Sequence, residues 1–89
     1  MNNQNDNINH PSHYTWLKDI CGVEVIDIAE NLNFNKGCAL KYILRSGRKN
    51  LFISNDDEKI AYEIEDLKKA AFFCNREADR LSKILNNGN

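Results

Sequence analysis

Apolar residues recur along the C-terminal third of the chain in alternating steps of four and three residues. They form one continuous seam: Ile60, Ile64, Leu67, Ala71, Cys74, Ala78, Leu81 and Leu85. This alternation is typical of an amphipathic helix that packs lengthwise against another helix. The pattern therefore predicts a helix over about residues 57–85, roughly 40 Å long at 1.5 Å per residue. We call these eight residues the apolar seam.

Two shorter segments upstream also show helical spacing. The first spans about residues 23–32 and places four apolar residues on one face: Val25, Ile28, Ala29 and Leu32. The second begins at Asn35, a residue type that favours the N-cap position, and runs to Arg45. Gly47 follows where a left-handed C-cap is expected.

The N-terminal segment lacks such a pattern. Residues 1–9 are mostly Asn, Gln and Asp, which predicts a polar tail without a core. Pro11 disfavours helix at His10, so an extended arm is expected to follow, docked on the body by Tyr14 and Trp16. The predicted fold is all-α: this arm, two short helices and one long C-terminal amphipathic helix, assembling through helix packing. It forms a single domain over residues 10–86, with a loose end at 87–89.

Composition narrows the class of protein. The chain has 89 residues and a formal net charge of -1, so no global positive field draws it to nucleic acid, and nothing indicates a duplex DNA site. Its three cysteines are widely spaced and suggest neither a disulfide framework nor a zinc site. The polar start and the short apolar runs predict a cytoplasmic protein without a membrane span.

The length of the predicted C-terminal helix points to self-association. Each shorter helix would extend only about 15 Å and would cover part of the apolar seam. A large exposed apolar stripe is unusual on a soluble monomer. We therefore expect a homo-oligomer formed through residues 57–85. The alternative is that the arm and both short helices, laid end to end, cover the seam.

A basic cluster is the strongest local signal for a ligand. Lys41, Arg45, Arg48 and Lys49 lie within nine residues, and Tyr42 lies beside them. Four cations next to an aromatic ring suit a phosphate group with a stacked base, and Arg45 is expected to point outward. The alternative is that the cations only complement the negative end of the helix dipole.

The arm and two acidic pairs add further candidates. His10 and His13 can donate hydrogen bonds to a phosphate, or belong to a plain surface turn. Tyr14 and Trp16 join Tyr42 as candidates for base stacking. The pairs Glu24–Asp27 and Glu63–Asp66 each place two carboxylates on one helix face, where they could hold Mg²⁺ or remain solvated. No phosphate-binding loop is present.

Four segments, taken in order, resemble the DUF3310 family of small phage proteins. They read HPSHY at 10–14, GVEVID at 22–27, ALKYILRSGRK at 39–49 and EDLKKA at 65–70. The resemblance implies a compact helical phage protein, and that family includes the C-terminal region of T7-like phage nucleotide kinases. The residues carried over by position are His10, Pro11, His13, Tyr14, Glu24, Lys41, Tyr42, Arg45, Gly47, Lys49, Asp66 and Lys69.

Three functions follow as hypotheses. In the first, the chain holds a nucleotide or cyclic nucleotide in a basic inter-subunit pocket, without a cofactor, and sequesters it as an anti-defence factor in the host cytoplasm. In the second, it is a deoxynucleoside monophosphate kinase or an Mg²⁺-dependent nucleotide hydrolase. In the third, the long helix binds a protein partner as a coiled coil.

Overall fold

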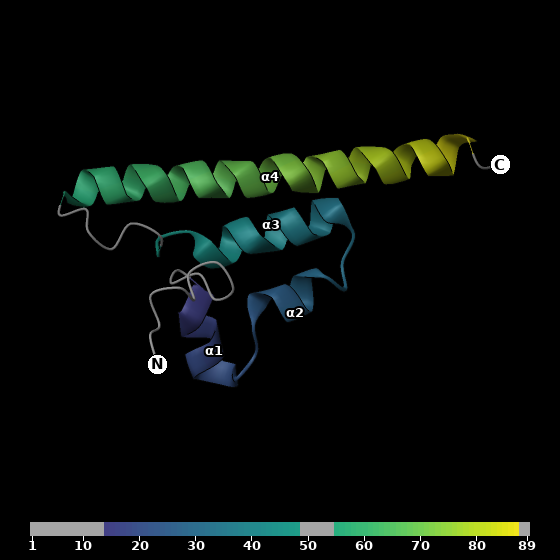
Figure 1. The fold of residues 1–89 in the computed structure, drawn as a ribbon. Helices are drawn as coiled ribbons and strands as arrows, with labels where there is room; N and C mark the ends of the chain where they lie inside the picture. Colours follow the sequence, from purple (N-terminus) through teal and green to yellow (C-terminus); the bar gives the residue numbers. More distant parts are fainter. Residues whose placement is uncertain (1–13, 49–54, 88–89) are drawn as a thin grey trace.

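The computed structural model describes residues 14–48 and 55–87. These residues form four helices and no strand: α1 (Thr15–Cys21), α2 (Val25–Ala29), α3 (Phe34–Arg45) and α4 (Asp56–Asn87). Helix α3 packs along α4 on one side and against α2 on the other. In Figure 1, α3 accordingly lies between the long α4 and the pair α1 and α2. The predicted all-α fold with a long C-terminal helix is confirmed.

Helix α1 is the first difference from the prediction, which placed only an extended arm before residue 23. Pro11 restricts the backbone of the residue before it, and this restriction does not reach Thr15. Gly22 ends the helix with φ 74°, and its N–H donates a hydrogen bond to the Lys18 carbonyl at 2.7 Å. The predicted polar tail at 1–9 and the histidines of the arm lie outside the described residues.

The other helix boundaries depend on asparagine side chains. The Asn31 amide donates to the Asp27 carbonyl at 2.7 Å, just past the end of α2, so that helix is shorter than predicted. The N-cap of α3 is Asn33, which accepts a hydrogen bond from the Lys36 N–H at 2.9 Å. The prediction of Asn35 as the cap is therefore wrong. The left-handed backbone predicted at Gly47 is confirmed, with φ 77°.

Helix α2 is held close to α3 at Gly37. A Cβ atom at this position would lie 3.3 Å from the carbonyl oxygen of Ala29, the last residue of α2. Glycine therefore lets a helix of only five residues sit directly on the α3 backbone. This close approach positions one wall of the candidate site.

The face of α4 that contacts α3 is not the apolar seam. The buried residues of α4 are Asp66, Ala70 and Glu77, with Phe73 half-buried beside them. Every one of the eight seam residues is exposed. The alternative in which the shorter helices cover the seam is therefore wrong for the described residues. Helix α3 presents amides and a guanidinium to α4, and the acidic residues of α4 supply their partners.

Within residues 14–48 and 55–87, each helix is either too short or too polar to span a membrane.

Candidate functional site

Two aromatic side chains dock α1 on α3. The Tyr14 hydroxyl donates to the Lys41 carbonyl at 3.4 Å, and the Trp16 indole N–H donates to the Leu44 carbonyl at 3.2 Å. Burying these rings while pairing their polar atoms lets both contribute to packing without an unpaired donor. The docking predicted for Tyr14 and Trp16 is confirmed.

A pocket of about 400 Å³ lies where Tyr14, α2 and α3 meet. Its interior is mostly apolar and is formed by Val25, Ile26, Ala29, Gly37 and Cys38. Small-molecule sites are typically concave, mostly apolar and about 300–1,000 Å³ in volume. No α4 residue lines this pocket, and all of its lining residues lie between positions 14 and 41 of the chain.

Six polar side chains border this apolar interior, and Thr15 and Asn33 are the two uncharged aliphatic ones among them. Lys41 contributes the cation, and Glu24 and Glu30 contribute carboxylates. The sixth is Tyr14, which is buried. Burial raises the pKa of its phenol above the ordinary value of 10.0, partly opposed by the nearby Arg45 guanidinium, so the ring stays neutral at physiological pH. The pocket thus combines one positive group, two negative groups and a neutral aromatic wall.

The basic cluster predicted from sequence does not act as one group. The Arg45 guanidinium donates to Asp66 Oδ1 at 3.0 Å, and Asp66 is fully buried. The expectation that Arg45 points outward is wrong, because α4 places this carboxylate against the end of α3. Lys41 and Arg48 remain exposed. Lys49, His10 and His13 lie outside the described residues.

Two of the predicted stacking rings already have neighbours. The Arg48 guanidinium lies 3.9 Å from the centre of the Trp16 ring. Tyr42 stacks on Phe73 with ring centres 5.9 Å apart and also contacts the cations of Arg45 and Lys69. Among the three candidate stacking residues, Tyr14 alone lines the pocket.

The acidic pairs do not assemble into a metal centre within the described residues. No group of three or more His, Cys, Asp or Glu side chains is placed there to hold a metal ion. Asp66 pairs with Arg45, while the Glu63 carboxylate lies 3.0 Å from the position that a Cβ would take at Gly47. The two members of this pair therefore have different neighbours.

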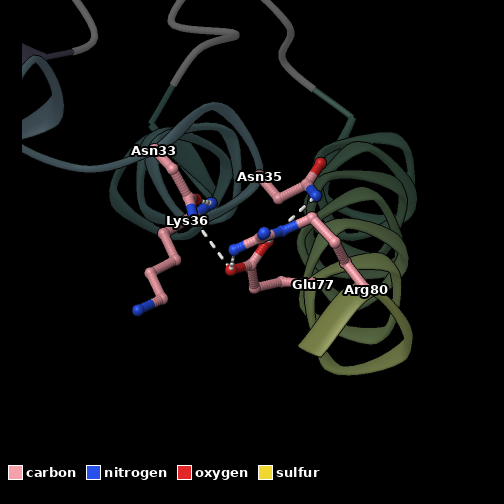
Figure 2. A network of polar contacts seen from close by, with 5 residues as sticks. All are labelled: Asn33, Asn35, Lys36, Glu77 and Arg80. Atoms are coloured by element: carbon pink, nitrogen blue, oxygen red, sulfur yellow. Dashed lines mark hydrogen bonds and ion pairs between the residues drawn. The ribbon is translucent and has the colours of Figure 1, made fainter. Parts of the chain in front are cut away.

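A second polar cluster, centred on Glu77, had no counterpart in the sequence analysis. Figure 2 shows Asn33 and Asn35 of the α3 start directed at Glu77, with Arg80 beside it. Their amides donate to the carboxylate at 2.7 and 3.1 Å, and Arg80 donates twice, at 3.0 and 2.7 Å. These bonds, led by the one from Arg80, lower the pKa of Glu77 from 4.5 to about 2. The cluster joins α3 to α4, and Asn33 alone of its four side chains also lines the pocket.

The four sequence segments of the resemblance gather on the two sides of α3. Tyr14, Glu24 and Lys41 come from the first three segments, and all line the pocket. Asp66 and Lys69, from the fourth segment, lie on α4. They contact side chains near the C-terminal end of α3, on its side facing α4. Sequence reasoning missed Glu30, Gly37 and Cys38 as pocket residues. A glycine inside a predicted helix was the available signal for a close helix contact.

The sequence model of a family described as protein of unknown function (DUF3310) matches residues 8–75. No curated protein and no solved structure matches the chain.

Proposed function

Because this chain belongs to the DUF3310 family, and three of the segments that carry the resemblance meet at one pocket, we propose that it binds a nucleotide there. The observation that carries this proposal is the joint presence of Tyr14, Glu24 and Lys41 around an apolar volume of about 400 Å³. These residues are far apart in sequence. A shared ligand gives one reason for their meeting around an apolar space.

The lining suggests how such a ligand would lie. The apolar interior and the Tyr14 ring suit a flat base, which is buried most favourably against apolar and aromatic groups. Carboxylate oxygens of Glu24 and Glu30 are acceptors suited to the amino and ring N–H groups of a base. Lys41 then contacts the phosphate as the pocket's point charge. The two carboxylates disfavour phosphate deep in the pocket, so we expect it at the exposed Lys41.

Binding without turnover is favoured over phosphoryl transfer. A kinase must hold donor and acceptor nucleotides together, with cations that neutralise the transferred group. The pocket volume suits one nucleotide, and Arg45, a member of the predicted basic cluster, is engaged by Asp66. A phage-encoded protein of this kind would bind a nucleotide signal and so lower its free concentration. This is the sequestering hypothesis, with the binding site in a pocket of one chain instead of between subunits.

A ligand screen with matched lysine variants tests the proposal. The wild-type protein is heated with nucleoside monophosphates, ATP and cyclic dinucleotides, with and without Mg²⁺, and each stabilising compound is recovered and analysed. We expect a bound nucleotide to raise the melting temperature and to return unchanged. Lys41→Ala should weaken binding by about tenfold or more, since a hydrogen bond to a charged group contributes about 1.5–3 kcal/mol.

Lys36→Ala is the control, because Lys36 is an exposed residue of the same helix and does not line the pocket. Equal binding by the wild type and Lys41→Ala would contradict the placement of the phosphate. Absence of any shift across the panel would contradict nucleotide binding itself. Conversion of the nucleotide would replace this proposal with the kinase or hydrolase alternative.

A further inference from the structure

Helix α4 exposes its apolar seam along its length. The large seam residues remain between 45% and 70% exposed: Ile60, Ile64, Leu67, Leu81 and Leu85. The three small residues between them, Ala71, Cys74 and Ala78, are exposed as well. The feature is thus a continuous apolar surface with large side chains at both ends and small ones in the middle.

The seam is accessible because α3 packs on a neighbouring face of α4. The contact face contains Asp66, Ala70, Phe73 and Glu77, and each of these residues directly precedes a seam residue. Consecutive residues on an α-helix are about 100° apart around its axis. The seam is therefore turned about 100° away from α3, and α3 leaves it open to a second helix. Figure 1 shows α3 along only one side of α4.

The area of the apolar seam is large enough for a contact with another protein chain. From Ile60 to Leu85 the seam is about 38 Å long, and a helix face is about 10 Å wide, which gives a projected area of about 400 Å². The largest apolar patch on a typical monomer covers about 300–600 Å² and is often functional. Residues flanking the seam would enlarge the area buried by a partner toward the roughly 800 Å² per partner of a stable complex.

We propose that the seam binds the same seam of a second copy of this chain, with the two α4 helices antiparallel. A two-fold axis near the middle of the seam then pairs Ile60 with Leu85 and Ile64 with Leu81 of the other copy. Leu67 meets Ala78, and Ala71 meets Cys74. Each seam residue then faces a seam residue of the other copy, large residues meet at the ends, and the small residues let the helices approach closely in the middle. This is the self-complementary surface that a two-fold dimer requires.

Charge along α4 selects the antiparallel direction. The first sixteen residues, 56–71, contain six acidic and three basic side chains, whereas residues 72–87 contain two acidic and three basic ones. Antiparallel pairing places the acidic half of each helix beside the basic half of the other, and it also opposes the helix dipoles. Parallel pairing would place the two acidic halves together.

This dimer is independent of the proposed ligand site. No residue of α4 lines the pocket, which lies beyond α3 from the contact face of α4. Each copy would therefore keep its pocket open while the seam is covered. Failure of dimerisation would leave the nucleotide proposal standing, and failure of nucleotide binding would leave the dimer standing.

Sedimentation equilibrium of the full chain tests the association. We expect a dimer for the wild type and a monomer for Leu67→Asp, because a charge would enter the apolar seam. Phe72→Asp is the control, since Phe72 is an exposed apolar residue of the same helix outside the seam, and it should remain dimeric. Circular dichroism and Trp16 fluorescence establish that each variant is folded. A monomeric wild type, or a dimeric and folded Leu67→Asp, would overturn the proposal.

Cysteine cross-linking tests the direction. The three native cysteines are replaced by serine, and Ile64→Cys and Leu81→Cys are made in separate chains of distinguishable mass. On mild oxidation we expect the mixed pair to form a covalent heterodimer, while each chain alone stays largely uncross-linked. Efficient cross-linking of Ile64→Cys with itself would overturn the antiparallel arrangement. As a second readout, the Ile60→Cys and Leu85→Cys pair should behave in the same way.

Discussion

Glu77 shows how a single carboxylate can join two helices. It accepts hydrogen bonds from two α3 asparagines and from Arg80 of its own helix, which together bring its pKa to about 2. A group whose pKa is lowered by folding stabilises the native state above its unfolded pKa, near 4.5, and loses that contribution as the pH falls toward its folded pKa. The contribution of Glu77 is therefore complete at neutral pH and is lost between about pH 4.5 and about pH 2.

Replacing Glu77 by glutamine should remove this pH dependence. Glu77→Gln is expected to be less stable than the wild type at neutral pH, and the difference should shrink steadily as the pH falls through this window. Urea unfolding at a series of pH values measures it. Glu65→Gln is the control. Glu65 is exposed, and its ion pair with Lys69, at 3.7 Å, lies on the surface, where such pairs contribute little to stability. Parallel pH profiles for Glu77→Gln and the wild type would contradict the role of Glu77.

The fully buried carboxylate of Asp66 and the half-buried guanidinium of Arg45 form an ion pair that residue spacing alone did not indicate. Lys41 and Arg45 share a helix spacing of four, which suggested a common outward face, but the structure directs Arg45 to the fully buried Asp66. The identity of a cation's partner depends on tertiary packing. The sequence shows that this segment is basic. It does not show which cation forms an ion pair within the fold and which one remains available to a ligand.

Asp66→Ala should destabilise the fold by about 3 kcal/mol, since it leaves the half-buried guanidinium of Arg45 without its carboxylate. Asp79→Ala, at an exposed position of the same helix, should change the free energy of unfolding by less than about 0.5 kcal/mol. Chemical denaturation of both variants gives the comparison. In the double variant Arg45→Ala/Asp66→Ala, part of the loss should be recovered. Equal stability of Asp66→Ala and Asp79→Ala would contradict the structural role of the pair.

At the scale of elements, the long helix was the most predictable part of the chain. Its heptad repeat covers many residues, so single exceptions do not obscure the period, and the predicted 57–85 falls within the observed Asp56–Asn87. The shorter helices were less predictable. Asn33 and Asn35 are equally good caps by residue type, and Asn33 takes that role while Asn35 binds Glu77. Such a choice depends on a residue 42 positions away.

Gly37→Val tests the contact that holds α2. A Cβ there would already press on the Ala29 carbonyl, and a branched side chain cannot fit without moving α2 away from α3. We expect a loss of about 2 kcal/mol of stability together with weaker nucleotide binding, because α2 forms one wall of the pocket. Lys36→Val is the control, because it introduces the same branched residue at the adjacent exposed position. It should retain wild-type stability and nucleotide binding. Unchanged melting of Gly37→Val would contradict the close contact.

At the scale of the whole molecule, the long helix presents two adjacent faces with different partners. The polar face binds α3 through Asp66 and Glu77, and the residues of the apolar seam are exposed in the single chain. Hydrophobic periodicity correctly indicated a long amphipathic C-terminal helix. It could not indicate that the contact within the chain would use the neighbouring polar face, because that depends on the amides and the guanidinium which α3 presents.

If the seam is covered by a second copy, folding and association are coupled. The melting temperature of the wild type should then rise with protein concentration by mass action. Leu67→Asp should melt at a temperature that does not depend on concentration. Differential scanning calorimetry over a hundredfold range of concentration provides the comparison. A wild-type melting temperature that is constant over this range would contradict dimerisation through α4.

The central claim is that a nucleotide occupies the pocket bordered by Tyr14, α2 and α3, and Cys38 allows this to be measured directly. Cys38 lines the pocket and is half-buried, whereas Cys21 and Cys74 are exposed elsewhere. The measurement is the rate of Cys38 alkylation by iodoacetamide in the Cys21→Ser/Cys74→Ser variant, at increasing concentrations of each nucleotide in the panel. We predict saturable protection of Cys38 by a nucleotide and weaker protection in Lys41→Ala. A nucleotide that binds the protein while Cys38 reacts at an unchanged rate would contradict it.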